Sequence, residues 1–81
     1  MQPKKGTRVR FTLDQLGASE RDDLGHIVGD PDVYGVGDEG VVAFPHPNKK
    51  RLPDWFYVEV KAKSDGRPLY VGVGPKMVEL L

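Results

Sequence analysis

Apolar and polar residues alternate most clearly in the stretch WFYVEV, which ends at Val60. Aromatic and β-branched residues with a period of two are typical of a β-strand. Phe56, Val58 and Val60 fall on one apolar face, and we expect that face to line the core. Trp55 and Tyr57 fall on the opposite face, beside a carboxylate. The pattern therefore predicts two large rings on the exterior of the fold.

The rest of the chain shows weaker versions of the same signal. We expect five strands in all, at residues 6–12, 40–44, 55–62, 69–73 and 77–81. Residues 13–38 are rich in Gly, Asp and Pro and predict one long loop between the first two strands. Capping patterns at Thr12 and Ser19 allow no more than short turns of helix within it. Five short strands without a long helix indicate an all-β fold, a small closed or half-closed barrel.

Length and composition limit the possible classes of protein. A chain of 81 residues predicts a single domain, spanning residues 1–81. The chain has no cysteine, no apolar run long enough to span a bilayer, and no apolar signal segment near its start. We therefore expect a soluble, cytoplasmic protein.

The net charge is zero, but the charges are unevenly distributed. Residues 1–10 carry four bases and no acid, whereas residues 11–40 carry eight acids and one base. Residues 41–81 carry seven bases and four acids. The neutral total disfavours nucleic-acid binding, because release of counterions requires clustered positive charge.

The segment from Gly35 to Gly40 reads G-x-G-x-x-G, the spacing of a dinucleotide-binding loop. That fingerprint requires a strand before it and a helix after it. A β-branched run follows here, so we interpret the segment as a glycine-rich turn that enters a strand.

No catalytic or metal-binding set emerges from the remaining residues. His26 and His46 are the only imidazoles, and the acids near His26 lack the spacing of a zinc or calcium site. Ser19 and Ser64 are the only serines, and neither lies in a nucleophile elbow. We expect neither an enzyme nor a cofactor or metal site.

Four segments together resemble the Src-homology-three-like small barrel superfamily, including its KOW-type members. They are G-x-x-V-x-F from Gly6, GDEGVV from Gly37, DWFYVEV from Asp54 and DGRPLYVGVGPKMVEL from Asp65. The resemblance covers most of the chain and implies a five-stranded barrel. Proline-peptide-binding relatives use an aromatic groove beside acidic loops and accept basic, proline-containing ligands.

The outward aromatic residues are the best candidates for a partner-binding site, because aromatic side chains are favoured anchors of protein interfaces. The candidate set combines these rings with acids of the predicted loop: Trp55, Tyr57, Tyr70, Tyr34, Asp30 and Asp32. The alternative is structural: residues 24–36 fold over this face, and Ile27, Val33 and Tyr34 cover Trp55. The preferred function is a non-enzymatic module that binds a protein partner.

Two further functions stay open. Basic residues beside the aromatic face are typical of single-stranded nucleic-acid binding, and the candidate set is Lys4, Lys5, Arg8, Arg10, Lys49, Lys50 and Arg51. A homo-oligomer with a small-molecule site between subunits is the other. Plasmid-borne dihydrofolate reductases are similar small barrels of that kind, with a V-Q-I-Y strand. The corresponding Pro68–Val71 stretch lacks the Gln, so that activity is not expected.

Overall fold

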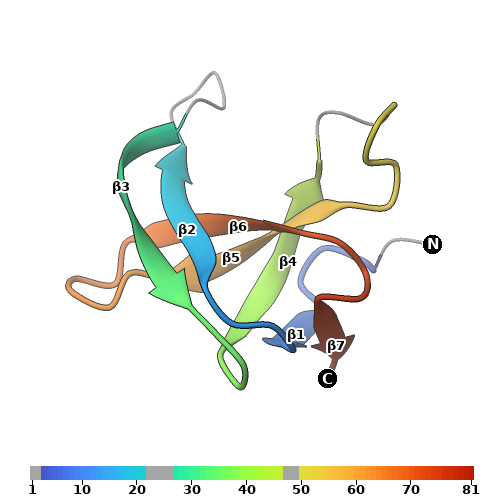
Figure 1. Cartoon of the computed structure of the whole chain (residues 1–81), viewed down its shortest axis with the longest axis horizontal. Coiled ribbons are helices and arrows are strands. Elements are labelled where there is room, and N and C mark those ends of the chain that lie inside the picture. The colour runs from blue at the N-terminus through green and yellow to red at the C-terminus, as the bar shows by residue number, and fades with distance from the viewer. Residues whose placement is uncertain (1–2, 22–26, 47–49) are drawn as a thin grey trace.

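The computed structural model describes residues 3–21, 27–46 and 50–81, and for Arg21, Ile27 and Asp30 it describes the backbone alone. These parts are all-β and contain no helix. The described residues form seven strands: β1 (Arg8–Phe11), β2 (Leu16–Arg21), β3 (Ile27–Tyr34), β4 (Glu39–Pro45), β5 (Phe56–Lys61), β6 (Pro68–Val73) and β7 (Val78–Leu80). They form one antiparallel sheet in the order β3-β2-β6-β5-β4-β1-β7 (Figure 1).

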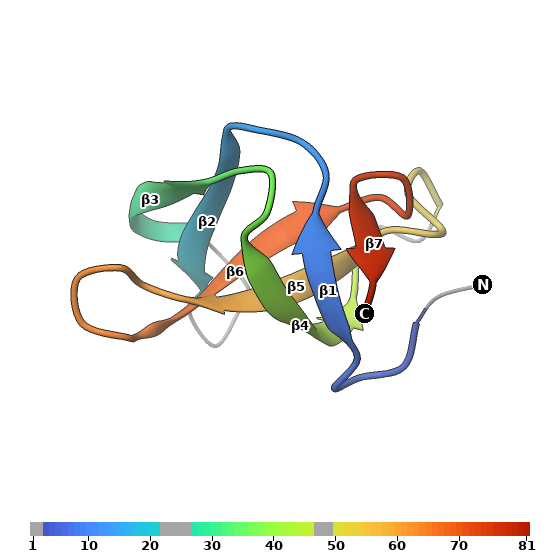
Figure 2. The same cartoon turned by 90° about the horizontal axis from the view of Figure 1, so that it is seen from below.

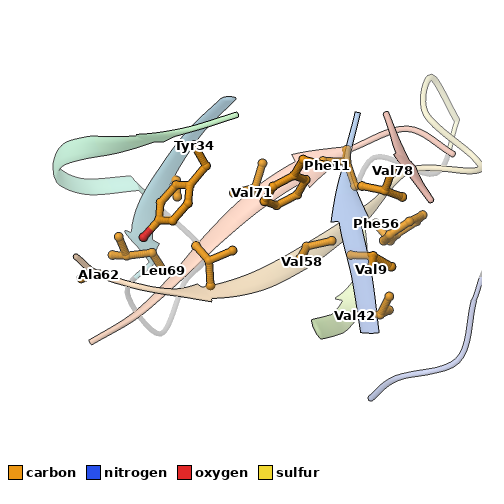
Figure 3. Packing of buried hydrophobic residues seen from close by; sticks show 13 residues of the cluster. Val9, Phe11, Tyr34, Val42, Phe56, Val58, Ala62, Leu69, Val71 and Val78 are labelled. Carbon is orange, nitrogen blue, oxygen red and sulfur yellow. The ribbon is translucent and has the colours of Figure 1, made fainter. Parts of the chain in front are cut away.

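Strands β5 and β6 run through the middle of the molecule (Figure 1 and Figure 2). The β2–β3 hairpin lies at one end of them and the β1–β7 pair at the other, as both views show (Figure 2). The sheet curves around a single cluster of buried apolar residues (Figure 3). Phe11, Phe56, Val58, Val71 and others are almost fully excluded from solvent there.

The predicted alternation of β5 is confirmed. Phe56, Val58 and Val60 are buried in the core cluster, and Glu59 between them is exposed. Tyr57 lies on the opposite face from the core residues, where it contacts other aromatic rings. The core face therefore follows directly from the sequence pattern.

The prediction of one long loop at residues 13–38 is wrong, and so is the count of five strands. Residues 16–21 and 27–34 form the β2–β3 hairpin. The capping pattern at Thr12 starts no helix, and the pattern at Ser19 continues into residues 22–26, outside the described residues. The five predicted strands exist, as β1, β4, β5, β6 and β7. The hairpin was missed because β3 is an edge strand, which tolerates Pro31 and polar residues that would disrupt an internal strand.

Polar contacts fix this hairpin to the turn between β5 and β6. The hydroxyl of Tyr34 donates a hydrogen bond to the carbonyl of Lys61. Lys63 donates its backbone N–H to Asp32 Oδ2 at 3.2 Å and its Nζ to the carbonyl of Val33 at 2.9 Å. Arg67 contacts Glu20 of β2 at 2.9 Å. The buried ring of Tyr34 closes this end of the core, beside Ala62 and Leu69 (Figure 3).

Candidate binding surface

Five aromatic side chains form a continuous row on the outer face of β4, β5 and β6. We call it the aromatic row: Tyr70, Phe44, Tyr57, His46 and Trp55. Successive ring centroids lie 5.4, 5.0, 5.2 and 6.4 Å apart. Phe44 has 40% of its surface exposed, whereas Tyr57 at the centre has only 5%. The row is thus a packed unit with an exposed apolar top.

A β-bulge places Phe44 in this row. The register between β4 and β5 shifts between Val42 and Phe44, so Val42 faces the core while Phe44 lies opposite Tyr57. In a regular strand, Val42 and Phe44 would point to the same face, because they are two residues apart. The extra residue of the bulge places them on opposite faces. Sequence reasoning missed Phe44 for this reason, because the sequence carries no clear signal of the bulge.

One glycine within β6 and one directly after it allow the rings to lie close to the backbone. A Cβ atom on Gly72 would lie 3.3 Å from Tyr57 Cε1, and one on Gly74 would lie 3.0 Å from Trp55 Nε1. Glycine inside a strand weakens it and is typical of sites where another group approaches the backbone. Here the approaching groups are the rings of Tyr57 and Trp55, which pack closely against the backbone at Gly72 and Gly74.

Tyr70 connects the row to a charged group. Its hydroxyl lies 3.5 Å from Glu59 Oε1, at the outer limit of a hydrogen bond. Burial raises the pKa of Tyr70 above its ordinary value, and the negative charge of Glu59 raises it further. Tyr70 therefore stays neutral at physiological pH and presents a hydroxyl at the end of the row.

The predicted partner-binding residues divide into two groups. Trp55, Tyr57 and Tyr70 come together in the aromatic row, but Tyr34 and Asp32 lie beside residues 61–63 at the far end of β5. Trp55 and Lys61 are six residues apart along an extended strand, a separation of roughly 20 Å. The side chain of Asp30 lies outside the described part of the structure.

The alternative in which residues 24–36 cover Trp55 is wrong for the side chains that the structure describes. Tyr34 is buried in the core and Val33 is 55% exposed, so neither covers the indole. The side chain of Ile27 lies outside the described residues. Trp55 is half-buried, through contacts with His46 and Gly74.

The predicted basic set is partly neutralised. Arg8 pairs with Glu39 at 2.7 Å, and Arg10 pairs with Glu79 at 3.0 Å. Lys4, Lys5, Lys50 and Arg51 are exposed, and Lys5 and Phe44 line the same shallow pocket. Lys49 lies outside the described residues.

The glycine-rich segment before β4 is a turn, as predicted. Asp38 N–H donates to the carbonyl of Gly35, Gly37 has a φ of 93°, and strand β4 follows at Glu39. The carboxylate of Asp38 accepts the N–H of Gly35, and Asp14 accepts that of Val36. These two acids therefore have a structural role in the turn.

Within residues 3–21, 27–46 and 50–81, no group of three or more His, Cys, Asp or Glu residues is arranged to hold a metal ion. His26 and the neighbouring Asp22 and Asp23 lie outside these ranges. The same parts of the chain contain no helix long and apolar enough to cross a membrane.

Comparison with known proteins found no matching protein-family model, no matching curated protein and no matching solved structure.

Proposed function

We propose that this protein is a non-enzymatic binding module that contacts a protein partner through the aromatic row. The observation that carries the proposal is the continuity of the five rings, with Phe44 exposed at 40% of its surface. Aromatic residues are enriched at the centres of protein interfaces, because they bury a large area with little loss of side-chain entropy.

The described strands do not close into a barrel, since β3 and β7 are the two edges of the sheet. We further infer that this curved sheet is an open variant of the Src-homology-three-like type. Five of its strands are adjacent in the order β6-β5-β4-β1-β7, so the first and last strands are neighbours. The β2–β3 hairpin then takes the place of the long loop between the first two barrel strands. We restrict the proposed contact surface to the aromatic row, because Tyr34 and Asp32 lie at the other end of β5.

Protein binding is preferred over single-stranded nucleic acid because the rings of the row are tilted against one another. Bases stack on exposed, roughly flat ring faces. In the row, His46 stacks on Tyr57 with an interplanar angle of 15°, and Phe44 is tilted by 46° from Tyr57 and by 53° from Tyr70. Such an uneven apolar surface suits the side chains of a polypeptide better than a run of bases.

Selection from a random peptide library displayed on phage tests the proposal. Peptides selected on the wild type should lose about tenfold or more in affinity for Phe44→Ala, which removes a central anchor. Val36→Ala is the matched control, because Val36 is 63% exposed on the turn before β4, outside the row. Selected peptides that bind Phe44→Ala as tightly as the wild type would refute the aromatic row as the binding site.

A further inference from the structure

A groove of about 550 Å³ opens where β3 ends beside the start of β4. Its volume falls within the usual range of small-ligand sites, about 300–1,000 Å³. The aromatic row and this groove meet at Glu59, which contacts Tyr70 on one side and lines the groove on the other. The groove therefore borders the aromatic row at Glu59 and extends from there toward Lys61, away from Trp55.

Part of the groove wall is apolar. Val41 of β4, which is 39% exposed, lines it together with the largely buried Val60 of β5 and Tyr34, and Gly40 adds no side chain. The Gly40 position cannot hold a larger residue without a clash, since a Cβ there would lie 2.4 Å from Val58 Cγ1. A short aliphatic chain therefore has an apolar surface to lie on.

The charged part of the groove wall has a small excess of acid. Asp38, Glu39 and Glu59 supply three carboxylates, against the cations of Arg8 and Lys61. Glu39 pairs with Arg8 at 2.7 Å and with Arg10 at 3.7 Å, so Asp38 and Glu59 supply the remaining negative charge. Burial raises the pKa of Tyr34, and the charges of Asp32 and Asp38 raise it further.

We propose that this groove binds a primary ammonium group carried on an aliphatic stem. The ammonium donates up to three hydrogen bonds in different directions, which suits carboxylates that come from different strands. The stem lies against Val41, Val60 and the ring of Tyr34. A free aliphatic diamine and a lysine side chain of another polypeptide share this chemistry, and the proposal does not depend on the aromatic row.

Amide NMR titrations of the ¹⁵N-labelled protein at low ionic strength test the site with three probes. Cadaverine and Nα-acetyl-lysine amide carry the ammonium, and pentanediol is the neutral analogue of cadaverine. We expect saturable shifts at Tyr34, Val41 and Val60 with cadaverine and none with pentanediol. Saturation by the lysine derivative as well assigns the groove to a polypeptide side chain, and saturation by cadaverine alone assigns it to a free diamine. Equal shifts with pentanediol, or no saturable shift in the groove, would overturn the proposal.

A matched pair of variants tests the role of the carboxylates. Glu59→Gln should weaken cadaverine binding at least about threefold, the order expected for an exposed ion pair. Asp65→Asn removes an exposed acid of the turn between β5 and β6 that pairs with Arg67 away from the groove, and it should leave the affinity unchanged. Both variants should keep the amide dispersion of the wild type. Equal weakening by the two variants would mean diffuse attraction and would contradict a defined site.

Discussion

At the scale of single residues, the closest packing constraint lies at Gly40. A side chain there would meet Val58 Cγ1 at 2.4 Å, the carbonyl of Glu59 at 2.8 Å and Val60 Cγ1 at 3.0 Å. Two of these atoms belong to core side chains and the third is backbone, so the site cannot relax cheaply. Gly40 is therefore required by close packing of β4 against β5.

Gly40→Ala should lower the free energy of unfolding by about 1–3 kcal/mol, the usual cost of overpacking a core. Urea denaturation measures the change. Gly17→Ala is the control, because its added Cβ would lie 3.6 Å from the Cβ of Pro31, an ordinary contact. Equal stability of Gly40→Ala and the wild type would contradict the close approach of the two strands.

Tyr34 should make the free energy of unfolding depend on pH in the alkaline range. Burial and the charges of Asp32 and Asp38 raise the pKa of Tyr34 above its ordinary value of 10.0. The folded state then holds the phenol proton more tightly than the unfolded state does. Its contribution to stability is therefore complete below about pH 10 and is lost as the pH rises above it.

Tyr34→Phe tests this contribution with two measurements. At neutral pH the variant should be roughly 0.5–1.5 kcal/mol less stable, because the hydrogen bond to the carbonyl of Lys61 is lost. Between about pH 9 and pH 11, its free energy of unfolding should fall less steeply than that of the wild type. Tyr70 is unchanged in both proteins and does not affect the comparison. Parallel pH profiles would show that Tyr34 titrates normally.

At the scale of elements, a strand could be predicted from the sequence when it has a neighbouring strand on both sides. β5 lies between β4 and β6, and every second residue along it is apolar and faces the core. This alternation is visible in the sequence, so the strand was predicted. β3 has a neighbour on one side only and accommodates Pro31 and Gly29, whose φ is 75°. Nothing in its composition distinguishes it from a loop, and the hairpin was therefore missed.

The β2–β3 hairpin should respond to changes at its contact with the turn after β5. Asp32→Ala removes the acceptor for the N–H of Lys63, which should cost about 1 kcal/mol. Hydrogen exchange of the hairpin amides should then become roughly fivefold faster, while the amides of β5 change little. Asp14→Ala, at the turn before β4, is the comparison, because Asp14 accepts from Val36 outside the hairpin. Uniform acceleration across all strands would show that the hairpin does not open on its own.

At the scale of the whole molecule, the sequence predicted an all-β chain and the outward position of Trp55 and Tyr57. It did not predict which distant residues meet. Phe44 joins the aromatic row through a bulge, and His46 joins it from the end of β4 by stacking on Tyr57. Tyr34 was expected beside Trp55 and instead closes the opposite end of the core. Bulges and edge pairings depend on the three-dimensional arrangement of neighbours, which a linear pattern does not record.

The balance of charge over the whole molecule predicts weak binding to nucleic acid. Twelve bases oppose twelve acids, and two of the bases predicted to contact phosphate, Arg8 and Arg10, are paired with acids across strands. At physiological salt we expect affinity for single-stranded homopolymers no tighter than about 10⁻⁴ M, the weak end of non-specific binding. Fluorescence of Trp55 at several salt concentrations measures it, and Lys5→Gln should change it little. Tight binding whose logarithm falls steeply with the logarithm of salt would instead favour the nucleic-acid function, because each phosphate contact adds about 0.7 to that slope for a single strand.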